Sequence, residues 1–200
     1  MQTWRIFEKW LYYINMRVIA GEKRHLLLKT VDSEAVRPTT DKIKETLFNI
    51  IQFKLKDVVF VDLFAGSGAI GIEALSRGAK KAYFVDNNKS AIKVINDNLY
   101  NTKLLDKSVV LYKDAKNSLQ YLEEINEKVN IIFMDPPYNK DLYYDCFAFL
   151  KKSLIINQNT MIILETSIDD NVNKICDLGF EITRVKEYKN QKHSFIKIVG

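Results

Sequence analysis

Residues 61–79 read VDLFAGSGAIGIEALSRGA, and this stretch decides the fold. It begins in an apolar run that predicts a buried strand and ends in a small and apolar segment that predicts a helix. Between them Gly66, Gly68 and Gly71 have the spacing G-x-G-x-x-G of a nucleotide-binding loop. Glycines at such a turn let the backbone approach a ligand closely. The spacing alone also fits a nicotinamide or flavin site, or a tight turn without a ligand.

Strand-like and helix-like segments alternate along the rest of the chain. The expected strands are residues 58–63, 82–85, 109–112, 131–134, 161–165, 180–185 and 195–199. The expected helices are residues 69–77, 90–100, 115–125, 142–150 and 172–178. Apolar strands separated by amphipathic helices are typical of a parallel sheet covered on both faces. We therefore predict an α/β fold with a seven-stranded, mostly parallel sheet, whose last two strands pair antiparallel across KEYKNQKH (186–193).

The N-terminal part of the chain has a different character. Apolar segments at 18–20 and 26–31 flank a polar GEKRH and predict a small β-hairpin. Thr40 or Asp41 can cap a following helix. The apolar face of that helix is expected to be Ile43, Leu47, Ile50 and Ile51. The predicted organisation is an N-terminal extension (1–15), a β-hairpin (16–36) and one main domain (37–200).

Composition limits the classes of protein to consider. The 200 residues are 47% hydrophobic, which is enough to bury a core, and the net charge of +5 permits a polyanionic partner. Cys146 and Cys176 form no disulfide framework or metal-ligand spacing, which suits a reducing cytoplasm. His25 and His193 have no ligand companions nearby in sequence, so no metal site is expected. The extension at 1–15 carries too many charges for a membrane span.

Acidic residues follow the first three strands, at the edge where parallel sheets bind ligands. Asp62 lies four residues before the first glycine of the loop. A carboxylate there repels a pyrophosphate and suits a cationic ligand, which favours S-adenosylmethionine over NAD. Asp86, about twenty residues beyond the glycines, can accept hydrogen bonds from a ribose diol or cap the next helix. Asp114 can bind an adenine amino group, although helix capping explains it equally well.

The fourth strand ends in a second motif, within VNIIFMDPPYNK (129–140). Asp135 can accept a hydrogen bond from an exocyclic amine, and a backbone carbonyl of the Pro136–Pro137 turn can accept another. Fixed φ angles hold such a turn in place. The ring of Tyr138 can stack on an extruded base. The predicted catalytic residues are Asp135, Pro136, Pro137 and Tyr138.

The segments MRVIAG, RPTTDKIKETLFN, DLFAGSGAIGIEALSRGA and DPPY together resemble the RsmD family of class I S-adenosylmethionine-dependent methyltransferases. The resemblance covers residue 16 to about residue 164, and it implies a Rossmann-like fold. It also implies methylation of the 2-amino group of one guanine in bacterial 16S ribosomal RNA. We then expect a cytoplasmic monomer that acts on this RNA or on the small subunit, with no metal and no membrane.

The motifs and the resemblance together define the expected sites. The predicted cofactor site comprises Asp62, Phe64, Gly66, Ser67, Gly68, Asp86, Asn87, Asp114, Ala115 and Asp135. The predicted RNA-binding residues are Arg17, Lys23, Arg24, Arg37 and Thr39. Two segments depart from the family pattern. The hairpin reads EKRHLLL in place of an R-G-R-like stretch, and QKHS stands where a tyrosine–glycine pair is expected.

Two alternative functions remain open from the sequence. A DNA amino-methyltransferase can use the same DPPY motif, but such enzymes normally carry a sizeable target-recognition domain, and only a short hairpin is present here. A catalytically inactive RNA-binding module is the non-enzymatic alternative. Such a module would not need the cofactor motif and the target motif intact together.

Overall fold

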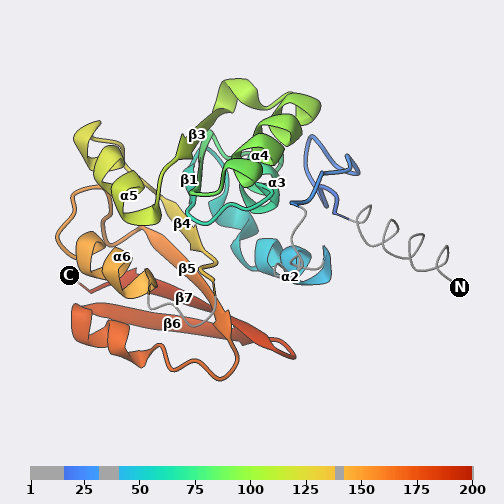
Figure 1. The fold of residues 1–200 in the computed structure, drawn as a ribbon. Coiled ribbons are helices and arrows are strands. Elements are labelled where there is room, and N and C mark those ends of the chain that lie inside the picture. The colour runs from blue at the N-terminus through green and yellow to red at the C-terminus, as the bar shows by residue number, and fades with distance from the viewer. Residues whose placement is uncertain (1–15, 32–40, 138–141, 200) are drawn as a thin grey trace, which may run out of the picture.

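The computed structural model describes residues 16–31, 41–137 and 142–199, and its centre is a seven-stranded sheet with strand order β3-β2-β1-β4-β5-β7-β6 (Figure 1). The parallel strands are β1 (Val59–Asp62), β2 (Lys81–Asp86), β3 (Ser108–Tyr112), β4 (Ile131–Met134) and β5 (Met161–Ser167). The last two strands, β6 (Phe180–Glu187) and β7 (Gln191–Ile198), run antiparallel to their neighbours. The predicted α/β fold is confirmed.

Helices cover both faces of this sheet (Figure 1). One face packs against α2 (Asp41–Ile51), α3 (Ala69–Ser76) and α4 (Lys89–Thr102), and the other against α5 (Ala115–Glu124) and α6 (Leu142–Leu150). Short 3-10 helices lie at Gln52–Lys54 (η1), Leu105–Lys107 (η2) and Asn173–Leu178 (η3). No helix in the described ranges is long and apolar enough to cross a membrane.

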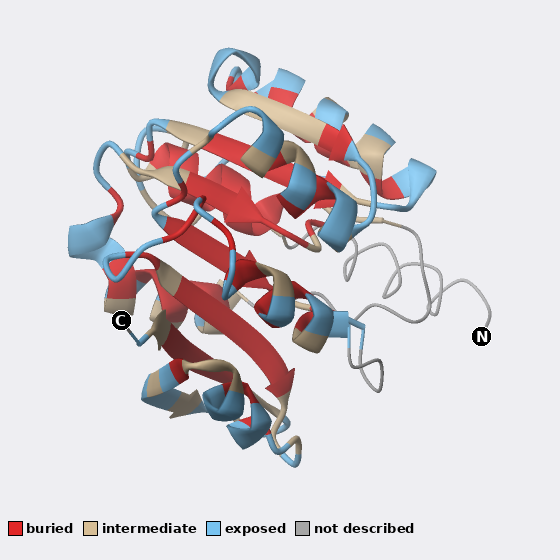
Figure 2. Cartoon of the chain, turned by 90° about the vertical axis from the view of Figure 1, so that its left-hand side faces the viewer, coloured by how far each residue is buried: buried red, intermediate tan, exposed pale blue. Residues whose placement is uncertain are grey.

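Alternation along each strand divides the core into two layers. Phe60, Phe84 and Phe133 belong to the layer under α2, α3 and α4, whereas Val61 and Met134 belong to the layer under α5 and α6. Successive side chains of a strand point to opposite faces, so a central strand that is covered on both sides must be apolar throughout. The buried strands and the exposed outer faces of the helices are visible in Figure 2. Because Asp62 lies two residues after Phe60 and Asp135 two residues after Phe133, the same alternation places both acids on the face under α2, α3 and α4.

The structure corrects three details of the predicted elements. Segment 172–178 is largely the 3-10 helix η3 and not an α-helix. The strands β6 and β7 take up most of the polar segment 186–193, because an antiparallel edge pair can expose polar side chains, and only residues 188–190 remain as the turn. The buried face of α2 differs from the prediction in that Ile43 and Ile50 are only half-buried; it consists of Lys44, Leu47, Phe48 and Ile51.

The predicted hairpin is present in a minimal form. One antiparallel bridge joins Arg17 to Leu27, and the Val18 amide donates to the Leu26 carbonyl (2.9 Å). The helix α2 buries a different face than predicted because Lys44 is buried. Its Nζ donates to the Arg17 carbonyl (2.6 Å) and so holds the hairpin. The hairpin therefore depends on the main domain and not on its own strand pairing.

Buried polar side chains of α3 and α4 complete this attachment. The carboxylate of Glu73, which is 0% exposed, accepts from the amides of Ile19 (2.7 Å) and Ala20 (3.0 Å). In α4, Asn98 accepts from the Lys29 amide (2.8 Å) and donates to the Lys29 carbonyl (2.9 Å). Because unsatisfied buried groups are costly, these contacts fix where the hairpin lies.

We predict that Glu73→Gln loosens the hairpin without disturbing the sheet. The amide nitrogen of the new side chain faces a backbone N–H that needs an acceptor, so the free energy of unfolding should fall by about 1–3 kcal/mol. Hydrogen exchange at the amides of Ile19 and Ala20 should accelerate. Glu45→Gln, at an exposed position of α2, is the control and should change neither quantity. Unchanged exchange at Ile19 and Ala20 would contradict the proposed attachment.

Candidate active site

The acidic residues identified in the sequence gather at the carboxyl edge of the sheet. Asp62 ends β1 and pairs in register with Phe84 of β2 and Phe133 of β4. Asp86 ends β2, and Asp135 directly follows β4. The charges of Asp86 and Asp135 are close enough to Asp62 to raise its pKa by repulsion. The strand order thus brings together residues that are far apart in the chain.

The glycine-rich loop is shaped by its backbone conformation and by close packing. Gly66 and Gly68 have φ angles of 53° and 78°, in the left-handed region that favours glycine. The helix α3 packs so closely on β2 that a Cβ atom on Gly71 would lie 2.3 Å from Phe84 Cε1. A Cβ atom on Gly66 would have no neighbour within 4 Å. The loop therefore has an open side at Gly66, next to the acidic edge.

Asp62 is a buried carboxyl group, with 1% of its surface exposed. Its Oδ2 accepts from the Gly71 amide at the start of α3 (3.0 Å). Burial is the main reason that the pKa of Asp62 rises to about 7, and the charges of Asp135 and Asp86 raise it further against the Gly71 hydrogen bond. The group is therefore poised near neutral pH and is stabilised in its ionised form by any cation that binds beside it.

Asp86 supports the glycine loop from the neighbouring strand. Its Oδ2 accepts from the Gly66 amide (2.8 Å), and its Oδ1 accepts from the Asn88 amide (2.8 Å). Burial raises the pKa of Asp86. The capping of α4 is performed by Asn88, whose side chain accepts from the Ser90 amide, so Asp86 is not the helix cap. Each of its oxygens keeps lone-pair capacity for a further donor.

The remaining predicted cofactor residues occupy different surroundings. Asp114 is exposed and caps α5, since its Oδ1 accepts from the Asn117 amide (2.8 Å). Its contact with an adenine stays a prediction. Phe64 and Ala115 are half-buried and Asn87 is exposed. Ser67 donates from Oγ to Met16 Sδ (3.3 Å), which links the glycine loop to the hairpin.

The second motif lies beside the glycine loop because β4 pairs with β1. The Leu63 amide donates to the Phe133 carbonyl (2.9 Å), so the chains after β1 and β4 leave the sheet together. Asp135 is half-buried; burial and, second, the charge of Glu165 raise its pKa well above the usual value. Pro136 is buried and Pro137 is exposed. Tyr138 lies outside the described residues.

Two acid–base residues at this edge have no role in the sequence analysis. Glu165, in β5, is 3% exposed, and its Oε2 lies 2.7 Å from Nε2 of the fully buried His193 in β7. An acid at the end of an apolar strand is the same signal that identified Asp62, so Glu165 could have been found. His193 could not, because its partner is 28 residues away and meets it only through the strand register.

The predicted RNA-binding residues that the structure describes lie in the hairpin. Arg17 pairs with Asp41 (3.0 Å) and Lys23 with Glu22 (2.7 Å), and Arg24 is exposed. Both ion pairs are at least partly exposed to solvent, and such pairs contribute little to stability, so these cations can exchange their partners for phosphates at small cost. Arg37 and Thr39 lie outside the described residues.

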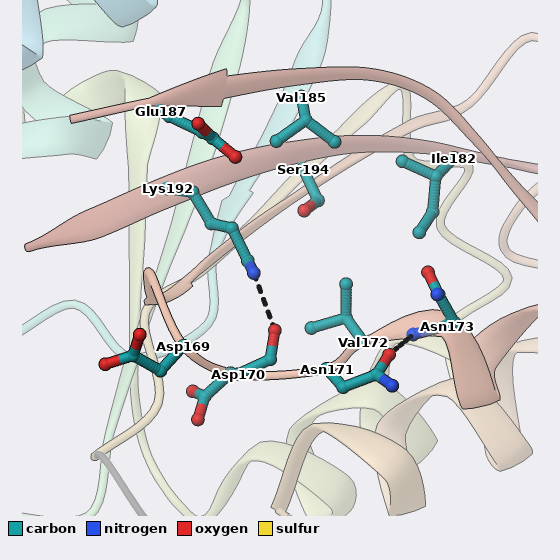
Figure 3. Close-up of a pocket in the computed structure, with 10 residues that line it drawn as sticks. All are labelled: Asp169, Asp170, Asn171, Val172, Asn173, Ile182, Val185, Glu187, Lys192 and Ser194. Carbon is teal, nitrogen blue, oxygen red and sulfur yellow. Dashed lines mark hydrogen bonds between the residues drawn. The ribbon is translucent and has the colours of Figure 1, made fainter.

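A separate groove of about 340 Å³ lies on the face of the sheet opposite to Asp62, the face that also packs against α5 and α6 (Figure 3). It is lined by residues 169–173 and by β6 and β7, and Lys192 Nζ crosses one end to donate to the carbonyls of Ile168 (2.9 Å) and Asp170 (2.6 Å). None of the predicted site residues lines it. Across the ranges that the structure describes, no group of three or more His, Cys, Asp or Glu residues is suited to a metal ion.

Comparison with known proteins shows which family and which relatives this chain resembles. A family model described as "Conserved hypothetical protein 95" matches residues 16–197. The Bacillus subtilis protein "Putative rRNA methyltransferase YlbH" is 37% identical over 150 residues, covering 75% of this chain and 82% of that protein. The Escherichia coli "Ribosomal RNA small subunit methyltransferase D" is 32% identical over 157 residues, covering 78% and 77%. The solved structure "Putative methyltransferase yhhF from Escherichia coli" matches with a TM-score of 0.77 at 27% identity, over 92% of this chain and 97% of that one.

We predict that Asp62→Asn stabilises the protein in a pH-dependent way. The folded-state pKa of Asp62 is raised from 3.8 to about 7. The free energy of unfolding therefore falls as the pH rises through that interval, and the loss stays constant at higher pH. Asparagine keeps an acceptor for the Gly71 amide and removes the cost. The variant should match the wild type near pH ~4 and exceed it at pH ~8 by on the order of 2–4 kcal/mol.

Urea unfolding at several pH values measures this difference. Asp106→Asn, at an exposed position of η2, is the control for the loss of an aspartate carboxyl group outside the site. An Asp62→Asn variant whose relative stability does not change with pH would show that the carboxyl group is not desolvated.

Proposed function

The chain belongs to the Conserved hypothetical protein 95 family, the family of the ribosomal RNA small subunit methyltransferases D, and we propose that it methylates the 2-amino group of one guanine in small-subunit ribosomal RNA. The methyl donor is S-adenosylmethionine. Membership in this family confirms the resemblance to RsmD. The enzyme acts in the cytoplasm, as a monomer and without a metal, on the RNA or on the small subunit that contains it.

The observation that carries this proposal is the uncompensated acidity between the glycine loop and the DPP turn. Within the described part of the chain, neither Asp62 nor Asp135 forms an ion pair. Buried carboxyl groups without a cationic partner lower native stability, and a bound cation offsets that cost. A ligand with a negatively charged pyrophosphate would increase that cost. A sulfonium and an ammonium group fit this edge.

The residues of the loop fit the rest of the same ligand. Bound S-adenosylmethionine supplies an electrophilic methyl group on its sulfonium. The ionised form of Asp62 attracts the positive charges, and the open side at Gly66 leaves room for backbone approach. Asp86, whose oxygens already orient the loop, accepts hydrogen bonds from the ribose hydroxyl groups. Asp114 and Ala115, at the start of α5, contact the adenine.

The DPP turn prepares the amine that receives the methyl group. The lone pair of an exocyclic amine is delocalised into the base, so the nitrogen is a poor nucleophile while it is planar. Asp135 accepts a hydrogen bond from one N–H. Prolines lack a backbone N–H, so the Pro136–Pro137 turn can offer carbonyl acceptors there without a competing donor. Together these acceptors favour the pyramidal, reactive nitrogen. After transfer, the nitrogen is cationic and its proton passes to water.

The hairpin supplies the contact with the ribosomal RNA backbone. Lys23 and Arg24 lie in the turn of the hairpin, and Met16 contacts the glycine loop through Ser67. Phosphate contacts by such cations position the target without reading its bases. Arg37 and Thr39, which lie outside the described residues, are predicted to bind the RNA as well. With so small an appendage, recognition relies on the shape of a folded ribosomal substrate.

Transfer of labelled methyl groups tests this function directly. The protein is incubated with labelled S-adenosylmethionine and small ribosomal subunits from a strain that lacks the activity, and the modified base is mapped. Label should appear on the 2-amino group of one guanine in the 16S RNA. Naked 16S RNA and duplex DNA are assayed in parallel. Label in DNA alone, or on an atom other than a guanine amino nitrogen, would overturn the proposal.

We predict that Asp135→Ala is far less active than Asp135→Asn. Asparagine keeps a carbonyl acceptor for the amine, whereas alanine removes it, which should cost on the order of 10²-fold in the rate of methyl transfer. Single-turnover kinetics measures this step, and calorimetry with S-adenosylhomocysteine checks that cofactor affinity is retained in both variants. Equal rates for the two variants would show that Asp135 acts as a base and not as an orienting acceptor.

A further inference from the structure

Asp135 is one member of a row of side chains that crosses three strands. Met134 pairs with Leu164, so the next residues along these parallel strands, Asp135 and Glu165, are neighbours across the sheet. Glu165 in turn pairs directly with His193 of β7. Neighbours in register share a face, and the edge-to-face contact of His193 with Phe133 (6.0 Å) places the row on the same face as Asp62.

Donors converge on the carboxyl group of Glu165 from β7. His193 Nε2 is 2.7 Å from Oε2, and the Gln191 side-chain amide donates to Oε1. His193 Nδ1 is 3.2 Å from the Tyr188 hydroxyl. Burial lowers the pKa of His193 to about 4, so the ring is neutral near pH ~7. With the Tyr188 hydroxyl donating to Nδ1, Nε2 carries the proton and donates to Glu165.

The two carboxyl groups face different partners. Glu165 has two donors, whereas Asp135 has no hydrogen-bond donor among the described residues and lies between Glu165 and the acidic Asp62. Burial raises the pKa of Glu165 to about 7, and its charge is the main electrostatic influence on Asp135. The charge on one group disfavours ionisation of the other, so the two titrate as a coupled pair that holds one shared proton before both are ionised.

Among the residues that the structure describes, other charged groups lie at the two ends of the row. Asp62 and Asp86 are on the side of β1 and β2. On the side of β6, Lys186 pairs in register with His193, and its Nζ lies 5.7 Å from the ring centre of Tyr188. The guanidinium carbon of Arg184, two residues before Lys186 in β6, lies 5.9 Å from the ring centre of Phe195. These cations lie beyond His193 and Glu165 as seen from Asp135.

We propose that Glu165 is a positioning residue for Asp135: held by His193 and Gln191, it keeps the shared proton on Asp135 in the ligand-free enzyme. Asp135 then gives up this proton only when a cation binds beside it or when the pH rises. A carboxylate is a stronger acceptor than the protonated group, so Asp135 is activated by the arrival of a positively charged ligand. Glu165 thereby sets the pH above which the target amine is oriented.

The carboxyl carbon resonances of labelled aspartate test this inference on the ligand-free protein. In the wild type the Asp135 resonance should follow a two-step titration that belongs to the coupled pair. In Glu165→Gln the step that belongs to Glu165 should be lost, and the midpoint of Asp135 should be lower by about 1 pH unit or more. Glu187→Gln, on the neighbouring strand β6, is the matched control and should leave the titration of Asp135 unchanged.

A second variant covers the case in which Glu165→Gln does not fold. Gln191 is half-buried, and Gln191→Met removes one donor from Glu165 without burying a new polar group. Loss of the donor moves the shared proton toward Glu165, so the midpoint of Asp135 should again fall, by less than in Glu165→Gln. An Asp135 midpoint that does not move in either variant would overturn the inference.

The kinetic consequence rests on the proposed function. In single-turnover methyl transfer, the rate of the wild type should fall as the pH is lowered, and Glu165→Gln should shift that fall to lower pH by the same amount as the titration midpoint. A residue needed only for packing would lower the rate at every pH. If no methyl transfer is found at all, the proposed function fails, while the titration of Asp135 still decides the role of Glu165.

Discussion

The parallel pairing of β1 with β4 is the constraint on which the site depends. It places the end of the glycine-loop strand beside the end of the DPP strand, so that Asp62 and Asp135 share one face and interact. The apolar layers above and below the sheet bury Asp62 and partly bury Asp135. Native stability is therefore lowered at the position where a cationic ligand can restore it, as functional sites commonly require.

The hairpin is coupled to the same loop through polar contacts rather than through an apolar core. Glu73 in α3 binds the Ile19 and Ala20 amides, and Asn98 in α4 donates both to the Lys29 carbonyl and to the Ser67 carbonyl (2.9 Å each). Because Asn98 bridges the hairpin and the glycine loop, a shift of one is felt by the other. The proposed binding of RNA at the hairpin and the proposed binding of the cofactor at the glycine loop can therefore influence one another without a separate hinge.

Local patterns in the sequence predicted most elements, and long-range register accounts for what they missed. The strand β4 and the helix α6 have the predicted bounds, because each is an apolar run that ends at a proline, polar or charged segment. The burial of Lys44 could not be predicted, since it depends on a carbonyl of the hairpin at Arg17. Likewise His193 appears isolated in the sequence, and only the β5–β7 pairing gives it a partner.

The reversal of strand direction at β7 explains why this partner comes from the end of the chain. In the parallel part of the sheet, only residues at the end of a strand or directly after it reach the carboxyl edge. Because β7 runs antiparallel to β5, its first residues lie at that edge, and Gln191 pairs with Ser167 there. The segment QKHS therefore contains both residues that contact Glu165, namely Gln191 and His193. We expect substitutions in it to change the ionisation of Glu165 and of the proposed catalytic residue Asp135 while the two core layers, and hence the fold, stay intact.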